Sequence, residues 1–299
     1  MSEDPIRARL RRLNARTEPA HPPAQSGACA EERRDVFARL ARRARGTAWV
    51  AQPAVSGEPV AHAPRALSLG TPRELNQSER GTWARTAWYE AGHQHGSRRL
   101  NEVFDVTLNT LAERARDERL KSIDLSRALF FDTETTGLSG GAGTYVYLVG
   151  LGRFTAGRFE LWQGFLPHPA EEKRLLEEVS LRIADASVLV SFFGKSFDRH
   201  RLEDKMRLHG VTPPFESTIH LDLYHPLRRA HRGQFENCKL KTLERELVGV
   251  VRTDDLPGSF APAAWFDFLA HRPHRLEGVF QHNADDVLSL ATLMCAVAT

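Results

Sequence analysis

The stretch FFDTETTGL at residues 130–138 places two acidic side chains at the end of an apolar strand. Alternate residues of an extended strand share a face, so Asp132 and Glu134 point to one side, while Phe131 and Thr133 point to the other. The strand therefore ends by presenting two carboxylates on the same face.

Two carboxylates at this spacing favour a bound cation. Unit charges a few ångströms apart repel by about 1 kcal/mol in water and by about 4 kcal/mol at the dielectric of a protein surface. Carboxylate oxygens in this arrangement suit Mg²⁺ or Mn²⁺, which also bind phosphate oxygens. The pair therefore indicates metal-assisted phosphoryl transfer.

The composition is that of a globular protein with a basic N-terminal arm. The chain has 299 residues, of which 41% are hydrophobic, and a formal net charge of +3. The first fifty residues contain eleven Arg and six acidic residues, and the rest is close to neutral. This arm either contacts the phosphates of nucleic acid or is a solvated tail.

Several classes of protein are excluded by features that the sequence lacks. No run of roughly 18 apolar residues predicts a membrane span, and the N-terminus MSEDPIRARLRRLNAR is charged where a signal peptide is apolar. Cys29, Cys238 and Cys295 are far apart and form no CxxC pair, which argues against disulfides, zinc and iron–sulfur clusters. We therefore expect a cytoplasmic protein without membrane contacts.

The chain is predicted to have three parts. Residues 1–80 are rich in Pro, Ala, Arg and Gly and are expected to be largely flexible, apart from a short helix over 31–45. Residues 81–120 contain apolar residues at helical spacing and are expected to form a bridging helical segment. Strand-like and helix-like stretches then alternate, which predicts an α/β domain over 121–299.

The elements of this domain predict a mixed sheet flanked by helices. Strands are expected over 128–133, 144–154, 158–167, 187–193 and 218–227. Helices are expected over 171–186, 197–210, 239–249, 261–272 and 282–298, with Gly249 as a C-cap. Three strands in a meander, followed by alternation of helices and strands, are typical of a mixed α/β sheet.

Two further sites are predicted to lie near the first carboxylates. Asp198 follows a strand in the turn SFFGKSFD, where Gly194 permits a close approach of the backbone. His282 and Asp286 in HNADDVLSL are four residues apart and so share one face of a helix. Asp285 is on another face of this helix and is expected to be solvated. A base and a metal ligand are therefore predicted to be neighbours.

Together the motifs resemble those of the DEDD superfamily of 3′ to 5′ exonucleases, which have the ribonuclease H-like fold. FDTETTGL is similar to the first motif, GKSFD to the second and HNADDV to the third, in the right order. With CKLKTLERELVG and DDLPG, the chain resembles the YprB-type ribonuclease H-like domain family over about 127–297. The resemblance implies an RNase H-like mixed sheet and a metal-dependent exonuclease that acts on single-stranded DNA or RNA.

The resemblance also implies roles for the matched residues. The four acidic ligands of two ions, Mg²⁺ or Mn²⁺, would be Asp132, Glu134, Asp198 and Asp286. His282 would be the general base, because an imidazole with a pKa near neutrality suits removal of a proton from water. The residues that line the cleft for the terminal nucleotide would be Thr135, Gly137 and Leu138.

For the remaining polar residues, two interpretations stay open. Lys195 either contacts a phosphate or is simply exposed. Asp222 is either a further residue of the site or a buried, hydrogen-bonded acid. His93 and His95 are either metal ligands or ordinary histidines. The arginines expected in a loop after the last strand, either for backbone contacts or for solubility, are Arg228, Arg229 and Arg232.

One departure from the family pattern leads to rival hypotheses. Phe193 stands where many relatives have an Asn that holds the terminal nucleotide, and it either stacks on a base or packs in the core. One rival is therefore a nucleic-acid-binding module whose catalysis has faded. Another is an accessory subunit whose Arg-rich arm recruits a protein. The four intact acids favour the enzyme, because a faded enzyme is expected to lose a ligand first.

Overall fold

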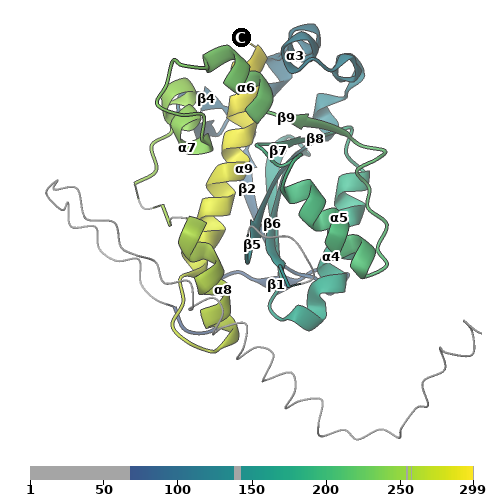
Figure 1. Ribbon diagram of the computed structural model, residues 1–299, viewed down its shortest axis with the longest axis vertical. Helices are drawn as coiled ribbons and strands as arrows, with labels where there is room; N and C mark the ends of the chain where they lie inside the picture. Colours follow the sequence, from purple (N-terminus) through teal and green to yellow (C-terminus); the bar gives the residue numbers. More distant parts are fainter. Residues whose placement is uncertain (1–67, 138–142, 254, 257, 299) are drawn as a thin grey trace, which may run out of the picture. The chain divides into compact units, whose positions relative to one another are not determined.

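Strand β5 (Ala128–Thr135) lies in the interior of the sheet because its side chains are apolar on both faces. Phe131 packs into the core on one face, and Phe130 packs into the core on the other. The same alternation directs Asp132 and Glu134 away from the Phe131 face. Figure 1 shows β5 between two layers of helices.

The fold is described from a computed structural model for residues 68–298, except 138–142, 254 and 257. These residues lie within one compact unit, Glu58–Thr299. Residues 1–67 of the segment predicted to be flexible, which include the helix predicted over 31–45 and Cys29, lie outside the described part of the chain, and so does Leu138. Residues 68–80 of that segment are described and include the short strand β1 (Asn76–Gln77).

The sheet is mixed, as the sequence predicts. Its strand order is β1-β2-β7-β6-β5-β8-β9. β5 runs antiparallel to β6 (Val146–Thr155) and parallel to β8 (Val188–Ser191). On the outer sides, β6 pairs with β7 (Arg158–Phe165), and β8 pairs with β9 (Ile219–Asp222). The carboxyl ends of β5, β8 and β9 therefore lie along one edge of the sheet.

Strand β2 (Trp83–Glu90) extends the sheet beyond β7, and β1 (Asn76–Gln77) pairs with β2. The prediction of a helical segment over 81–120 is therefore wrong for β2, although α3 (Leu108–Ala115) is helical as expected. The strand forms because β7 supplies a hydrogen-bonded partner along its whole length, and local spacing of apolar residues does not reveal such a partner.

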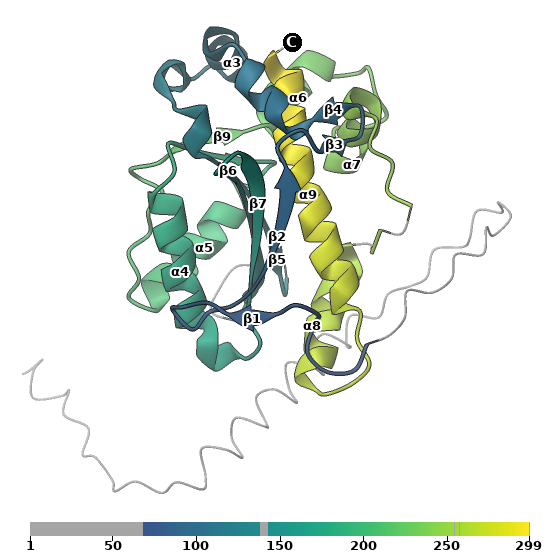
Figure 2. The ribbon, with the colours of Figure 1, turned by 180° about the vertical axis from the view of Figure 1, so that it is seen from behind.

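Helices cover both faces of the sheet, as Figures 1 and 2 show. α4 (Glu172–Ala184) and α5 (Asp198–Leu208) pack against each other on one side, and the long α9 (Leu276–Ala298) contacts β5, β6 and β7 on the other. The start of α9 packs against α8 (Ala261–Leu269). This layering confirms the predicted α/β architecture of the RNase H type.

Short elements complete the described chain. They are β3 (Gln94–His95), β4 (Arg98–Arg99), α6 (Tyr224–His231), α7 (Leu240–Leu243), a π-helical turn (Glu244–Val248) and the 3₁₀ turns Leu100–Asp105, Glu118–Ser122, Leu125–Arg127, Pro169–Glu171 and Gly258–Phe260. Gly249 ends the π-helical turn at φ 66°, as predicted for a C-cap. In this part of the chain no helix is both long and apolar enough to cross a membrane.

The strand predicted over 218–227 ends early. Asp222 closes β9, and its side chain accepts a hydrogen bond from the backbone N–H of Tyr224 at 3.1 Å. The chain then turns into α6, because this bond satisfies a donor at the start of the helix. Arg228 and Arg229 therefore lie on a helix and not in a loop.

Candidate active site

Asp132 is held in place by an asparagine of α9. Asn283 Nδ2 donates to Asp132 Oδ2 at 2.9 Å, and Asn283 Oδ1 accepts from Gln163 Nε2 at 2.9 Å. Gly150 of β6 makes room for this amide, since a Cβ there would lie 2.3 Å from Asn283 Oδ1. The sequence analysis missed Asn283, although its position three residues before Asp286 places it on a neighbouring part of the helix surface.

Asp198 reaches the site from the opposite side of β5. It is the first residue of α5, where a carboxylate is favoured by the helix dipole, and it is buried. Thr133, which points toward the α5 layer, donates a short hydrogen bond to Asp198 Oδ1. A Cβ on Gly194 would lie 2.7 Å from Ser191 Oγ and 3.1 Å from Asp198 Oδ2, which explains the small residue in this turn.

The carboxyl groups lie close enough to oppose one another's ionisation. Burial, and then the charges of Asp286, Asp198 and Glu134, hold the pKa of Asp132 well above its ordinary value. Burial is also the largest cause that raises the pKa of Glu134 to about 8 and that of Asp198 to about 6. The structure therefore brings the four predicted acids together at the end of β5, where they form a site that favours cations.

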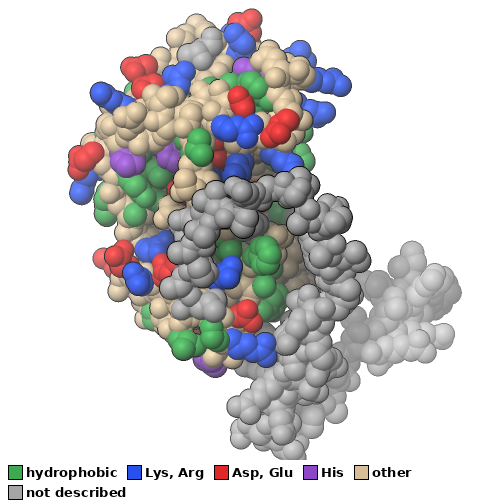
Figure 3. Space-filling model, turned by 90° about the vertical axis from the view of Figure 1, so that its left-hand side faces the viewer, with side chains coloured by type: hydrophobic (Ala, Val, Ile, Leu, Met, Phe, Trp, Pro, Cys, Tyr) green, Lys and Arg blue, Asp and Glu red, His purple; other side chains and the backbone are tan. Residues whose placement is uncertain are grey.

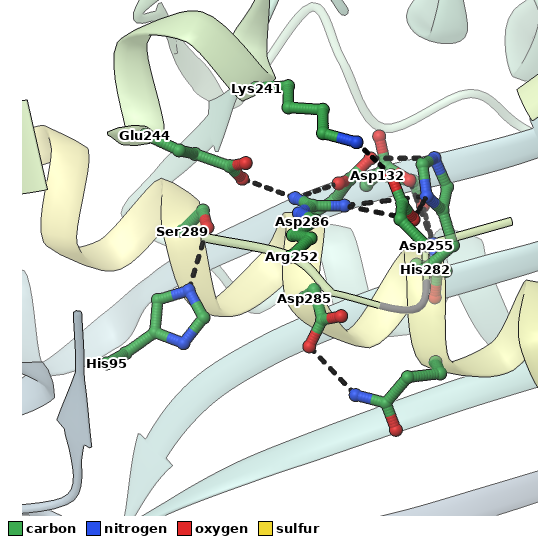
Figure 4. A network of polar contacts seen from close by, with 12 residues as sticks. His95, Asp132, Lys241, Glu244, Arg252, Asp255, His282, Asp285, Asp286 and Ser289 are labelled. Carbon is green, nitrogen blue, oxygen red and sulfur yellow. Dashed lines mark hydrogen bonds and ion pairs between the residues drawn. The ribbon is translucent and has the colours of Figure 1, made fainter. Parts of the chain in front are cut away.

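Asp286 is paired with an arginine that the sequence analysis did not identify. Arg252 Nη2 lies 2.5 Å from Asp286 Oδ1 and also contacts Glu244 Oε1 (Figure 4). The Arg252 side chain is 4% exposed and that of Glu244 is fully buried. Burial lowers the pKa of Arg252, but Asp286 and Glu244 more than offset this effect. The Arg252 guanidinium therefore supplies a positive charge at the site, next to Asp286.

His282 lies beside Asp286, as predicted, and has a second acidic partner. Its Nδ1 lies 2.5 Å from Asp255 Oδ1, and its Nε2 lies 3.7 Å from Asp286 Oδ2. Burial alone lowers the pKa of His282, but Asp255, Asp286 and Glu134 raise it to about 9. This value differs from the expected pKa near neutrality, because the sequence analysis did not include Asp255.

The acids do not form a ready-made ligand cage. In the described part of the chain, no three His, Cys, Asp or Glu side chains are placed to hold one metal ion together. Asp132 is instead bonded to Asn283, Asp198 to Thr133, and Asp286 to Arg252. The all-oxygen donor set and its mutual repulsion nevertheless fit a hard divalent cation, and an ion that binds Asp286 competes with Arg252.

The predicted substrate residues lie at the two strand ends that flank the acids. Thr135 is the last residue of β5, and its Oγ1 donates to the carbonyl of Gly137 at 3.2 Å. Lys195 lies in the turn between β8 and α5, and its backbone N–H donates to Asp222 Oδ2 at 3.1 Å. Asp222 is thus a buried, hydrogen-bonded acid. The side-chain roles of Thr135, Gly137 and Lys195 stay predictions.

A polar cavity is lined in part by His282 and by its partner Asp255. It has a volume of about 520 Å³, and its lining includes His95, Arg252 and Asp285. His95 Nε2 lies 2.8 Å from Ser289 Oγ, and burial is the largest cause that lowers the pKa of His95 to about 4 (Figure 4). His95 is therefore a half-buried, hydrogen-bonded histidine. Asp285 is partly buried and accepts from Gln281 at 2.8 Å, so it is less solvated than predicted.

The surface around α7 and α8 carries charges of both signs. Figure 3 shows this side of the domain, with Lys and Arg side chains interspersed among Asp and Glu. The visible side chains therefore form separate cationic points and not a broad basic patch, in agreement with the near-neutral charge of this part of the sequence.

We expect the metal-free protein to lose stability as the pH rises from 7 to 9. Glu134 and His282 both have a raised pKa in the folded state, about 8 and about 9, so the folded protein binds more protons than the unfolded chain. The contribution of Glu134 is fully present only below its ordinary pKa of 4.5 and that of His282 only below 6.5, so both are still being lost as the pH rises from 7 to about 8 and about 9, respectively. Between pH 7 and 9, His95 is neutral in both the folded and the unfolded state, so it does not contribute to the change of stability with pH.

The measurement is the melting temperature in EDTA at each pH. A fall of roughly 5–10 °C is expected, from a loss of a few kcal/mol. Glu134→Gln should flatten the curve, because it removes one of the two groups. A melting temperature that is constant or rises between pH 7 and 9 would contradict the proton binding described above.

We expect Arg252→Gln to lower the free energy of unfolding of the metal-free protein by about 3–5 kcal/mol, because Glu244 loses the partner of its buried charge. Urea unfolding measures this loss. The double variant Glu244→Gln/Arg252→Gln should recover part of it. The matched control is Arg245→Gln, whose half-exposed ion pairs are screened by solvent and contribute little to stability. Equal effects of Arg252→Gln and Arg245→Gln would contradict the account.

Known proteins resemble this chain over much of its length. The RNase_H_2 family of the RNase_H superfamily matches residues 129–298. The chain is 36% identical over 208 residues to the uncharacterized protein YprB of Bacillus subtilis (strain 168). That match covers 69% of this chain and 50% of the relative, so the chain spans half of the relative's length. A similar solved structure is the family B DNA polymerase of the hyperthermophilic archaeon Pyrobaculum calidifontis, with a TM-score of 0.44 and 19% identity over 56% of this chain and 24% of the polymerase.

Proposed function

Since the chain belongs to the YprB-type ribonuclease H-like family, within the RNase H superfamily, we propose that it is a divalent-metal-dependent 3′ to 5′ exonuclease of single-stranded nucleic acid. One observation carries the proposal. Four carboxylates from β5, α5 and α9 lie at one end of the sheet, where burial first and then neighbouring carboxylates raise the pKa values of Asp132, Glu134 and Asp198 above their ordinary ranges. Such a concentration of buried negative charge suits cations and the phosphates that accompany them.

The ligands of Mg²⁺ or Mn²⁺ would be Asp132, Glu134, Asp198 and Asp286. Two such ions would supply a lowered pKa for an attacking water and stabilisation of charge on the oxygens of a phosphodiester. Asn283 orients the Asp132 carboxylate, and Thr133 orients that of Asp198. These contacts fix the two acids before substrate arrives, which is what a preorganised site requires.

His282 is the proposed general base. Asp255 occupies its Nδ1, so Nε2, on the side of Asp286, is the atom that accepts a proton from water. The carboxylates of Asp286 and Glu134 that raise its pKa are among those that cations neutralise, so its pKa falls toward its ordinary value when they are neutralised. The imidazole can then work as a base near neutral pH.

The 3′ end of the nucleic acid is proposed to lie across the turns that follow β5 and β8. Thr135 and Gly137 provide backbone and hydroxyl groups on one side, and Lys195 provides a cation for phosphate on the other. The preference for single strands and the 3′ to 5′ direction follow from the family resemblance.

The test is a cleavage assay with 5′-labelled single-stranded DNA and RNA in Mg²⁺, Mn²⁺ or EDTA. We expect a ladder that shortens from the 3′ end, no products in EDTA, and no cleavage of a circular single strand. Products from the circle would contradict an exonuclease. An absence of products from every substrate with either ion would contradict the nuclease itself.

A second candidate is a nucleic-acid-binding module without catalysis. The observation in its favour is Arg252, whose guanidinium already neutralises Asp286 and so competes with a metal ion. In that case the protein would retain oligonucleotides in a binding assay, independently of divalent ions, and would leave them intact in the cleavage assay.

A further inference from the structure

Phe193 has a backbone conformation that is unusual for its residue type. Its φ is 60°, in the left-handed region that side chains with a Cβ disfavour. Asn adopts this region more readily than other non-glycine residues, and Asn is the residue of many relatives at this position. Phe193 therefore presents an aromatic ring from a backbone conformation that its residue type disfavours.

The turn is fixed by hydrogen bonds to one buried acid. Asp222 Oδ1 accepts the backbone N–H of Phe193 at 2.8 Å, and Asp222 Oδ2 accepts that of Lys195 at 3.1 Å. Between them, Gly194 lies against Asp198. The position of Phe193 relative to the acidic site is therefore set by the fold.

The ring of Phe193 does not pack in the core. The residue is 46% exposed, so the core interpretation is wrong. Its ring lies 4.9 Å from that of Tyr224, centroid to centroid, in an edge-to-face arrangement. The Arg228 guanidinium lies 5.7 Å from the Tyr224 ring. Phe193 and Tyr224 thus form an aromatic pair at the surface, supported by α6 and next to a cation.

We propose that Phe193, supported by Tyr224, is a stacking platform for an unpaired nucleobase near the strand end that the acids cleave. The inference rests on the proposed function and specifies how that site holds its substrate. A nucleobase fits because it is flat and apolar on its faces. The phosphate of the same nucleotide would lie near the cations Lys195 and Arg228. Strained backbone that the surrounding structure holds in place is typical of functional sites. Stacking tolerates any base, so the platform predicts binding without sequence preference.

The experiment measures the affinity of the full chain for a fluorescein-labelled 12-nucleotide single strand by fluorescence anisotropy in EDTA. Phe193→Ala should raise Kd by about 5- to 150-fold, the usual worth of one stacked base. Phe193→Trp should bind as tightly as the unchanged protein or more tightly. The matched control is Phe104→Ala, since Phe104 is 45% exposed and also has an aromatic neighbour, Phe154, at 4.7 Å. This control should not change Kd.

A second oligonucleotide, whose three 3′-terminal nucleotides are abasic, identifies the contact as stacking. The unchanged protein should bind it as weakly as Phe193→Ala does, and Phe193→Ala should not distinguish the two oligonucleotides. If the affinities of Phe193→Ala and the unchanged protein are equal within a factor of two, the proposal of a stacking platform is wrong, and the proposed nuclease function is unaffected. If the unchanged protein binds neither oligonucleotide, the platform is overturned as well, whereas the proposed nuclease function fails only if the cleavage assay in Mg²⁺ or Mn²⁺ also gives no products.

Discussion

Replacing Asp132 with Asn should lower cleavage by about 10³-fold or more, because the variant loses an anionic ligand whose metal contributes several kcal/mol to transition-state stabilisation. The amide can still accept the hydrogen bond from Asn283, so the local structure should persist. Initial rates on a 5′-labelled single strand in Mn²⁺ measure the effect. The matched control is Asp204→Asn, an exposed aspartate on α5, which should keep its activity within a factor of two.

The stability of Asp132→Asn separates lost chemistry from lost structure. Folding raises the pKa of Asp132, so ionisation of this group opposes folding above about pH 4. Asn carries no charge, and the metal-free variant should therefore be as stable as the unchanged protein or more stable at pH 7. This difference should vanish below about pH 4. Wild-type activity of the variant in Mn²⁺ would exclude Asp132 as a ligand.

Replacing His282 with Ala should lower the rate of cleavage by about 10²- to 10⁴-fold, the usual contribution of a positioned proton acceptor. Activity of the unchanged protein should rise with pH as His282 loses its proton, between its ordinary pKa of 6.5 and the value of about 9 in the ion-free protein. The variant should lack this limb of the pH profile. Replacement by Tyr, used elsewhere in the superfamily, should restore part of the rate.

The control for this variant is His200→Ala, because His200 is an exposed histidine on α5 with a single acidic neighbour, Glu203. It should keep both the rate and the pH profile. If His282→Ala instead retains activity within a factor of three with its pH limb intact, His282 is structural and another group accepts the proton.

The central part of the fold could be predicted because its information is local. The two-residue period of β5 and the apolar stripe of α4 predict which faces are buried. The stripe residues Leu176, Val179 and Ile183 are all buried in the structure. β2 could not be predicted in this way. The exposure of its residues alternates from Arg85 to Glu90, but their polarity does not follow, since Arg85 is partly buried and Trp88 is exposed. The strand forms because β7 lies beside it.

Some residues of the candidate site could be predicted and others could not, for the same reason. The spacing of Asp132 and Glu134, and that of His282 and Asp286, follow from the periods of a strand and a helix, so their proximity could be predicted. Arg252 and Asp255 come from an irregular loop, where no period relates position to direction. Their contacts depend on how that loop lies against α9, and this explains why the cation at Asp286 and the raised pKa of His282 were missed.

The central claim is that the four acids at the end of β5 bind catalytic metal ions. The most direct test is the anomalous difference map of crystals soaked in Mn²⁺. We predict two peaks about 4 Å apart, within coordination distance of Asp132, Glu134, Asp198 and Asp286, with Arg252 moved away from Asp286. A map without peaks among these carboxylates, with Arg252 still on Asp286, would contradict the claim.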